Sequence, residues 1–221
     1  MHIMDGYLPL SHAVAWTVAS APFVVNGYRQ LRQSSDTDGR FVLATATAFT
    51  LLLSSLKLPS VAGSSSHPTG TALGTMVVGA SVMSVVSTLV LLFQALLLAH
   101  GGLTTLGANV FSMGVVGPWS ALFVYRLLTR LHLSALVAIG AAAFVGDMST
   151  YVTTSLQLAL AHPEAGASFS GAFVRFLGVF SLTQFPIAVL EGALTVLVFR
   201  ALPVQMRGAM ELKRTLSSRL A

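Results

Sequence analysis

The first residues of this sequence place three nitrogen atoms where they could chelate one transition metal ion. The amino nitrogen of Met1 and the backbone amide nitrogen of His2 would close a five-membered ring on the ion. That amide nitrogen and Nδ1 of the His2 imidazole would close a six-membered ring. Three nitrogens in a plane favour ions with square-planar or tetragonal geometry, such as Ni²⁺, Cu²⁺ or low-spin cobalt, over Ca²⁺ or Mg²⁺.

The chelate requires Met1 to begin the mature chain. The segment Met1–Pro9 contains Asp5 and no Lys or Arg, so it lacks the positively charged region of a secretory signal peptide. We therefore expect no cleavage before the first helix and a free amino group on Met1. Chains that begin Met-His also arise by chance, so this pattern alone does not decide for a metal site.

A fourth nitrogen would complete the plane, and His67 is the candidate. It lies in the polar stretch 58–70, whose serines could orient an imidazole through hydrogen bonds. His2, His67 and His100 fall on the same face of the topology described below, whereas His162 is expected to be a solvated loop residue. Each of the three, taken alone, is more simply an ordinary polar loop residue.

The elements that must position these groups are membrane-spanning helices. The chain has 221 residues, of which 54% are hydrophobic and only 9% charged, whereas soluble domains carry about 25% charged residues. Soluble enzymes, disordered tails and coiled coils are therefore disfavoured. The net charge of +5 forms no basic stripe with interleaved aromatics, so no nucleic-acid partner is expected. The absence of cysteine excludes disulfides and thiolate metal sites.

Apolar stretches separated by polar residues, Gly or Pro predict an all-α integral membrane protein with about seven transmembrane helices in a single domain, 1–221. The run 71–100 would make one helix of about 45 Å, longer than the ~30 Å hydrocarbon core, so we place a break at Gly79. The predicted spans are 10–27, 41–57, 70–82, 85–100, 108–128, 133–160 and 172–200.

The positive charges predict the orientation of these spans. With seven spans, ten of the twelve Lys and Arg residues lie on one side, which the positive-inside rule makes cytoplasmic. The amino-terminal segment 1–9 and the loop 58–70 are then outside, and the basic tail 201–221 is inside. Only Lys57 and Arg175 lie outside; the ten are Arg29, Arg32, Arg40, Arg126, Arg130, Arg200, Arg207, Lys213, Arg214 and Arg219.

Three segments resemble the cobalt- and nickel-specific substrate-binding membrane components of energy-coupling factor transporters, the CbiM/NikM type. They are Met1–Pro9, Leu56–Thr71 and Phe93–Asn109, and the similarity extends over nearly the whole chain. The resemblance implies a six-helix core to which an N-terminal helix has been added. It also implies an amino terminus that enters an outward-facing pocket.

The same resemblance implies that Met1, His2 and His67 ligate the metal, and Met4-Asp5 favours cobalt over nickel. The implied activity is capture of Co²⁺ and its import for cobalamin biosynthesis, by a chain that is not itself an enzyme and uses no cofactor. The implied partners in the prokaryotic inner membrane are a transmembrane coupling subunit, ATP-binding cassette ATPase subunits and a small accessory membrane subunit. The lack of a Walker sequence agrees with ATP hydrolysis by partners.

Other interpretations remain open on the sequence. A nickel-selective transporter of the same type is the nearest alternative. A gradient-driven carrier would use the intramembrane carboxylates of Asp147 and Glu191 as proton relays, although structural hydrogen bonding is the favoured role for both. A membrane metalloenzyme is less favoured, because the sequence lacks H-E-x-x-H. The small residues Ala44 and Ala48 could dock the coupling subunit or pack within the chain.

Overall fold

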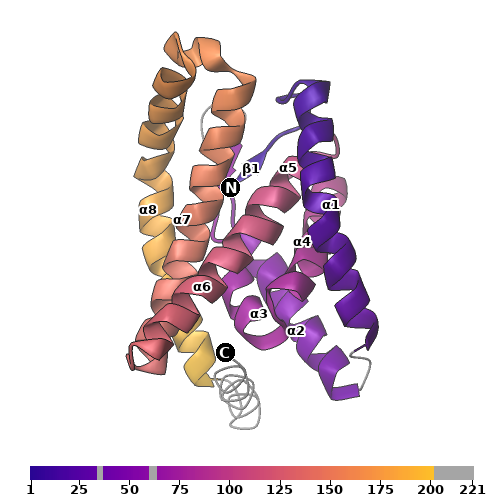
Figure 1. The fold of residues 1–221 in the computed structure, drawn as a ribbon, viewed down its shortest axis with the longest axis vertical. Coiled ribbons are helices and arrows are strands. Elements are labelled where there is room, and N and C mark those ends of the chain that lie inside the picture. Colours follow the sequence, from indigo (N-terminus) through magenta and orange to yellow (C-terminus); the bar gives the residue numbers. More distant parts are fainter. Residues whose placement is uncertain (34–36, 60–63, 202–221) are drawn as a thin grey trace.

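The computed structural model of the protein describes residues 1–33, 37–59 and 64–201 (Figure 1). Within these residues the chain is a bundle of helices with one very small β-sheet. Every predicted span coincides with a helical segment, with ends shifted by a few residues. The helical segments are α1 (Leu10–Gln33), α2 (Thr37–Ser54), α3 (Thr71–Val78), α4 (Ala80–Leu97), α5 (Leu106–Asn109), η1 (Val110–Val116), α6 (Gly117–Arg130), α7 (Ala135–Ala161), η2 (Pro163–Gly166) and α8 (Phe169–Ala201).

The break predicted in the apolar run 71–100 is confirmed at Gly79. The helix α3 ends before this residue and α4 begins directly after it. Gly79 has φ 92° and ψ 154°, a backbone conformation that residues other than glycine rarely adopt. The glycine therefore allows two short helices in place of one that would exceed the bilayer thickness.

The fifth predicted span is one continuous helix, Leu106–Arg130, whose middle part η1 is π-helical. A π-helical turn displaces backbone carbonyl groups from their usual partners. Two of these carbonyls accept hydrogen bonds from neighbouring helices: Ser112 O from Thr150 Oγ1 at 3.3 Å, and Gly114 O from Ser84 Oγ at 2.7 Å. These buried contacts fix the segment between α4 and α7.

Four of the described helical segments are long and apolar enough to cross a membrane. They are Ala80–Leu97, Leu106–Arg130, Ala135–Ala161 and Phe169–Ala201, and α2 contains a shorter apolar helix, Gly39–Ser54. The protein is thus built as a multi-pass membrane protein. The total of seven spans and their orientation stay predictions, and the predicted basic tail lies outside the described residues from 202 onward.

The polar stretch 58–70 contains strands, which the sequence does not predict. The strands β2 (Leu58–Pro59) and β3 (Ser64–Ser66) form an antiparallel sheet with β1 (His2–Ile3) in the order β1-β3-β2. His2 pairs with Ser65 and Ile3 with Ser64. Strands of two or three residues are too short to show an alternating pattern, so the purely helical expectation is wrong here.

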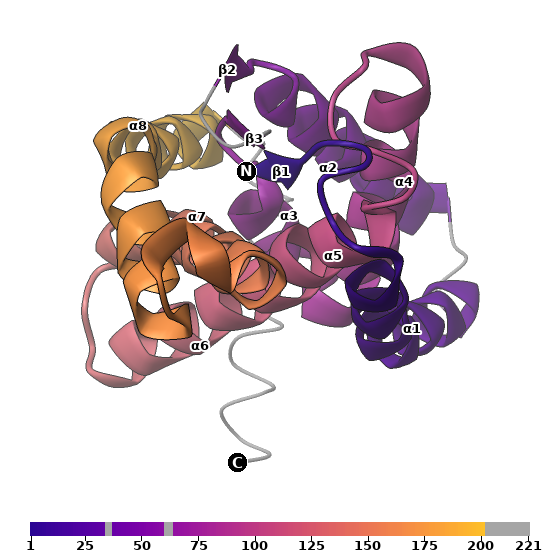
Figure 2. The same ribbon diagram turned by 90° about the horizontal axis from the view of Figure 1, so that it is seen from above.

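The strands β1 and β3 lie in the interior of the molecule, whereas Leu58 of β2 is exposed. Seen from above, the N-terminus and β1 lie between α7 and α8 on one side and α1 and α4 on the other (Figure 2). The helix α7 packs against α6 and α8, and α1 packs against α4. The bundle therefore surrounds the chain end that the sequence marks as a chelator.

Candidate metal centre

The first three residues are completely buried. Met1, His2 and Ile3 each have 0% of their surface exposed. Beyond the pairing of β1 with β3, the side chain of Asn109 holds the backbone of Ile3 on both sides. Its Oδ1 accepts a hydrogen bond from Ile3 N at 2.8 Å, and its Nδ2 donates one to Ile3 O at 3.0 Å. Asn109 thus fixes how deeply the amino terminus enters the bundle.

The residues that follow are fastened at the surface. The carboxylate of Asp5 accepts hydrogen bonds from the backbone nitrogen and hydroxyl of Thr104 at 2.8 and 2.7 Å. These hydrogen bonds hold the pKa of Asp5 below its usual value. On the other side of the segment, His162 Nε2 donates to the carbonyl of Tyr7 at 2.8 Å. His162 is thus bound to the amino-terminal segment and is not simply a solvated loop residue as the sequence predicts.

His67 reaches the same place from the loop between β3 and α3. The carboxylate of Glu191 on α8 accepts hydrogen bonds from Thr69 N, Thr69 Oγ1 and Gly70 N at 2.5, 2.8 and 2.9 Å. Glu191 thereby holds the loop, in agreement with the predicted structural role. His67 Nδ1 lies 2.9 Å from Pro68 O. Since a carbonyl can only accept, Nδ1 carries the hydrogen and Nε2 carries the lone pair.

The three histidines predicted to share one face lie together. Nε2 of His67 is 3.1 Å from Nδ1 of His2, and the ring centroid of His100 is 4.5 Å from that of His2 and 4.9 Å from that of His67. One ligand nitrogen from each of the three lies within 4.8 Å of the others. Every one of these side chains is buried.

Burial keeps these nitrogens unprotonated. Burial lowers the pKa of the Met1 amino group to about 6 and that of His100 to about 3. It also lowers the pKa values of His2 and His67, and the positive charge of the amino terminus lowers all three histidine values further. The amino group and the three imidazoles thus act on one another electrostatically. A neutral amine and neutral imidazoles are the forms that donate electron pairs to a metal.

The structure therefore brings together Met1, His2 and His67, the residues that the sequence and the resemblance indicate. It adds His100 to the group, which the sequence places on the same face without assigning it a role. Asn109 holds the backbone of Ile3 through a contact that spacing alone does not reveal, whereas the structural role of Glu191 is predicted from the sequence. The histidine spacing is not periodic, because the residues come from a strand and two loops.

Asp147 is buried in the bundle, as an intramembrane carboxylate should be. Its Oδ2 accepts a hydrogen bond from Gln184 Nε2 at 2.6 Å, and Gln184 Nε2 also lies 3.3 Å from His67 O. The predicted structural hydrogen bonding of this residue is thus observed. Through Gln184 it supports the same loop that carries His67.

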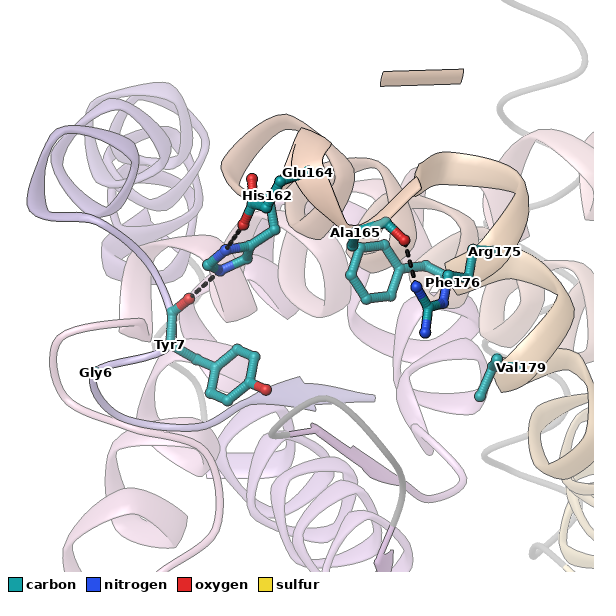
Figure 3. Close-up of a pocket in the computed structure, with 8 residues that line it drawn as sticks. All are labelled: Gly6, Tyr7, His162, Glu164, Ala165, Arg175, Phe176 and Val179. Carbon is teal, nitrogen blue, oxygen red and sulfur yellow. Dashed lines mark hydrogen bonds and ion pairs between the residues drawn. The ribbon is translucent and has the colours of Figure 1, made fainter. Parts of the chain in front are cut away.

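A separate pocket of about 560 Å³ opens beside the amino-terminal segment (Figure 3). The Tyr7 side chain lies on one side of it, with His162 and Glu164 above and Arg175 on α8 across from it. Arg175 Nη1 donates to Ala165 O at 2.5 Å. None of the three clustered histidines lines this pocket, so the cluster is enclosed rather than open to it.

The family model described as "Cobalt uptake substrate-specific transmembrane region", CbiM, matches residues 2–208 of the chain. The chain belongs to the CbiM family. Its relatives include the cobalt transport protein CbiM of Streptomyces coelicolor, which is 54% identical over 94% of this chain and 90% of that protein. The cobalt transport protein CbiM 1 of Pelobacter propionicus is 52% identical over 91% and 90%.

Solved structures agree with the fold of this CbiM-family chain. A truncated transition metal transporter matches with a TM-score of 0.81 and 25% identity over 90% of this chain and 96% of that one. A second transition metal transporter matches with a TM-score of 0.84 and 24% identity over 100% and 99%. The overall arrangement of the helices thus has experimental counterparts.

Proposed function

We propose that this CbiM-family chain captures divalent cobalt and delivers it for import as the substrate-specific subunit of an energy-coupling factor transporter. The observation that carries the proposal is the meeting of a buried amino terminus, Nδ1 of His2 and Nε2 of His67, with 3.1 Å between the two imidazole nitrogens. The amino nitrogen, the amide nitrogen of His2 and the two imidazole nitrogens supply four donors. Such a set suits a tetragonal transition metal ion.

The ion is cargo, so the site must both bind and release it. The chain would bind Co²⁺ on the outer face, and ATP hydrolysis by partner subunits would drive its passage inward. A transmembrane coupling subunit, ATP-binding cassette ATPases and a small accessory membrane subunit are the proposed partners. Supply of cobalt to cobalamin biosynthesis is the proposed use.

Nickel is the second candidate cargo. The four donors are all nitrogen, and nitrogen sites bind Ni²⁺ more tightly than Co²⁺ in the Irving–Williams order. Affinity measured in a test tube therefore does not identify the natural cargo. Metal analysis of protein purified from cells grown with equal trace amounts of both ions identifies the natural cargo. We expect cobalt to predominate.

Uptake measurements with the partner subunits test the transport mechanism. ATP-dependent uptake of Co²⁺ should survive Asp147→Asn, because an asparagine oxygen can still accept the hydrogen bond of Gln184. A proton-driven carrier would lose transport with this variant. Glu191→Gln is the weaker test, since Glu191 also holds the loop that carries His67.

A further inference from the structure

Three side chains and a carbonyl form a buried line of hydrogen bonds that ends on His2. Nε2 of His2 lies 2.9 Å from Oε1 of Gln94 on α4. Nε2 of Gln94 donates to Ser54 Oγ on α2 at 2.7 Å, and Ser54 Oγ donates to the carbonyl of Thr50 at 2.5 Å. All four residues have 0% of their surface exposed, so water does not offer an alternative partner.

The direction of this line is fixed from its far end. The Thr50 carbonyl can only accept, so the single proton of Ser54 points to it, and Ser54 Oγ must accept from Gln94. The amide nitrogen of Gln94 is therefore on the Ser54 side and its oxygen faces His2. An oxygen facing Nε2 requires a hydrogen on that nitrogen.

A neutral imidazole carries one hydrogen, so a hydrogen on Nε2 leaves the lone pair on Nδ1. Nδ1 is the atom that the six-membered chelate ring needs. The other tautomer would place a hydrogen where the metal ion binds. The tautomer of His2 is therefore determined by Gln94 on α4 and Ser54 on α2, which do not themselves bind the ion.

We propose that Gln94 and Ser54 are positioning residues that hold His2 in the tautomer whose Nδ1 can bind the cargo ion, an inference that rests on the proposed metal site. Gln94 presents the acceptor, and Ser54 prevents the Gln94 amide from rotating by half a turn. Residues that orient metal-ligating histidines in this way typically change metal affinity by about 10- to 100-fold. A loss in this range is expected when either is removed.

The tautomer can be read directly in metal-free protein. Nitrogen-15 NMR of the full chain in detergent micelles, with labelled histidine, distinguishes Nε2–H from Nδ1–H. We expect His2 to be Nε2–H in the wild type and in Gln94→Glu, which keeps the acceptor. Gln94→Met and Ser54→Ala should add the Nδ1–H form. Ser87→Ala is the matched control. Ser87 lies on the same helix as Gln94, and its Oγ is buried without a hydrogen-bond partner.

Titration with Co²⁺ completes the experiment. Gln94→Met and Ser54→Ala should bind about 10- to 100-fold more weakly, while Ser87→Ala binds as the wild type does. An Nδ1–H His2 in the wild type would overturn the inference whether or not any variant folds. An unchanged tautomer and affinity in Ser54→Ala would also overturn it. If the wild type shows the expected tautomer but binds no Co²⁺, the proposed function fails, and that failure is separate from the tautomer readings.

Discussion

Nδ1 of His2 and Nε2 of His67 face each other at 3.1 Å although the two residues are 65 positions apart in the chain. Both nitrogens are buried and carry lone pairs in the tautomers that their neighbours impose. Two lone pairs at this distance repel each other unless something positive lies between them. In the proposed metal site, an ion bound between these two nitrogens would remove their repulsion.

Three histidines near the amino-terminal segment, His67, His100 and His162, should differ in their importance for metal binding. His67→Ala should weaken Co²⁺ binding most, because it removes a donor that directly faces His2. His100→Ala should cost less, since the His100 Nε2 is already engaged at 2.8 Å with Ser65 Oγ. His162→Ala should cost least, because it removes only contacts with Tyr7 and Glu164 outside the buried cluster. Isothermal titration of the three variants measures the order, and equal losses would indicate a diffuse site.

Adding one residue before Met1 should abolish tight binding. The addition converts the amino nitrogen into a poor amide donor and moves the free amine out of ring-closing reach. We expect the affinity for Co²⁺ to fall by more than the ~100-fold that removal of a supporting residue costs. The same residue appended after Ala221 is the control and should leave the affinity unchanged. Normal binding by the extended chain would place the site elsewhere.

The metal-free protein should become less stable as the pH is lowered from about 8. The amino group has a reference pKa near 8, and in the folded protein its pKa is about 6. Between these values the unfolded chain binds more protons than the folded one, so the free energy of unfolding decreases as the pH is lowered. The lowered pKa values of the clustered histidines extend the loss below pH ~6.5.

Thermal denaturation in detergent, at about pH 8 and about pH 5.5, checks this prediction. His162→Gln should show the same decline, because His162 lies outside the buried cluster. Stability that stays constant or rises as the pH falls would show that the amino terminus is not buried in its neutral form.

Few protons should be released when Co²⁺ binds at about pH 7.5. An amino group of ordinary pKa would be mostly protonated there and would give up its proton. With a pKa of about 6 it is mostly neutral already, so the His2 amide is the main source and the expected count is close to one. Calorimetry in buffers of different ionisation enthalpy counts the protons. A count near two would mean that the amine is protonated in the resting protein.

Gly102→Ala should loosen the amino-terminal segment and weaken metal binding. A Cβ at Gly102 would meet the carboxylate of Asp5 and come within 2.5 Å of the Asp5 backbone nitrogen. Gly178→Ala is the matched control, because a Cβ there has nothing within 4 Å. Co²⁺ titration should show a loss of about 10-fold or more for the first variant and none for the second. Equal affinities would mean that the segment can shift without disturbing the donors.

The sequence predicts the donors better than their supports. The chelate rings follow from covalent geometry at Met1 and His2, so no tertiary structure is needed to propose them. The break at Gly79 also follows, because bilayer thickness limits helix length. The roles of Asn109 and Gln94 do not follow. Asn109 and Gln94 contact residues that are 106 and 92 positions away in the chain, and no pattern in the neighbouring sequence predicts these contacts.

The sheet is the other feature that escapes a sequence pattern. β1 and β3 exist because the buried backbone of His2 and Ile3 needs partners, and the edge of the 64–66 segment supplies them. Such pairing is a consequence of burial and not of β propensity. The sequence accordingly predicts the polarity of the loop but not its conformation.

The enclosure of Met1 has a consequence for biosynthesis. Residues 1–3 find their partners only after synthesis has passed Asn109, which holds Ile3, and Glu191, which holds the loop that carries His67. The amino-terminal segment therefore lacks these hydrogen-bond partners while the helices are being inserted into the membrane. Once docked, Met1 has no exposed surface, so any reagent that modifies its amino group must reach it before the bundle closes.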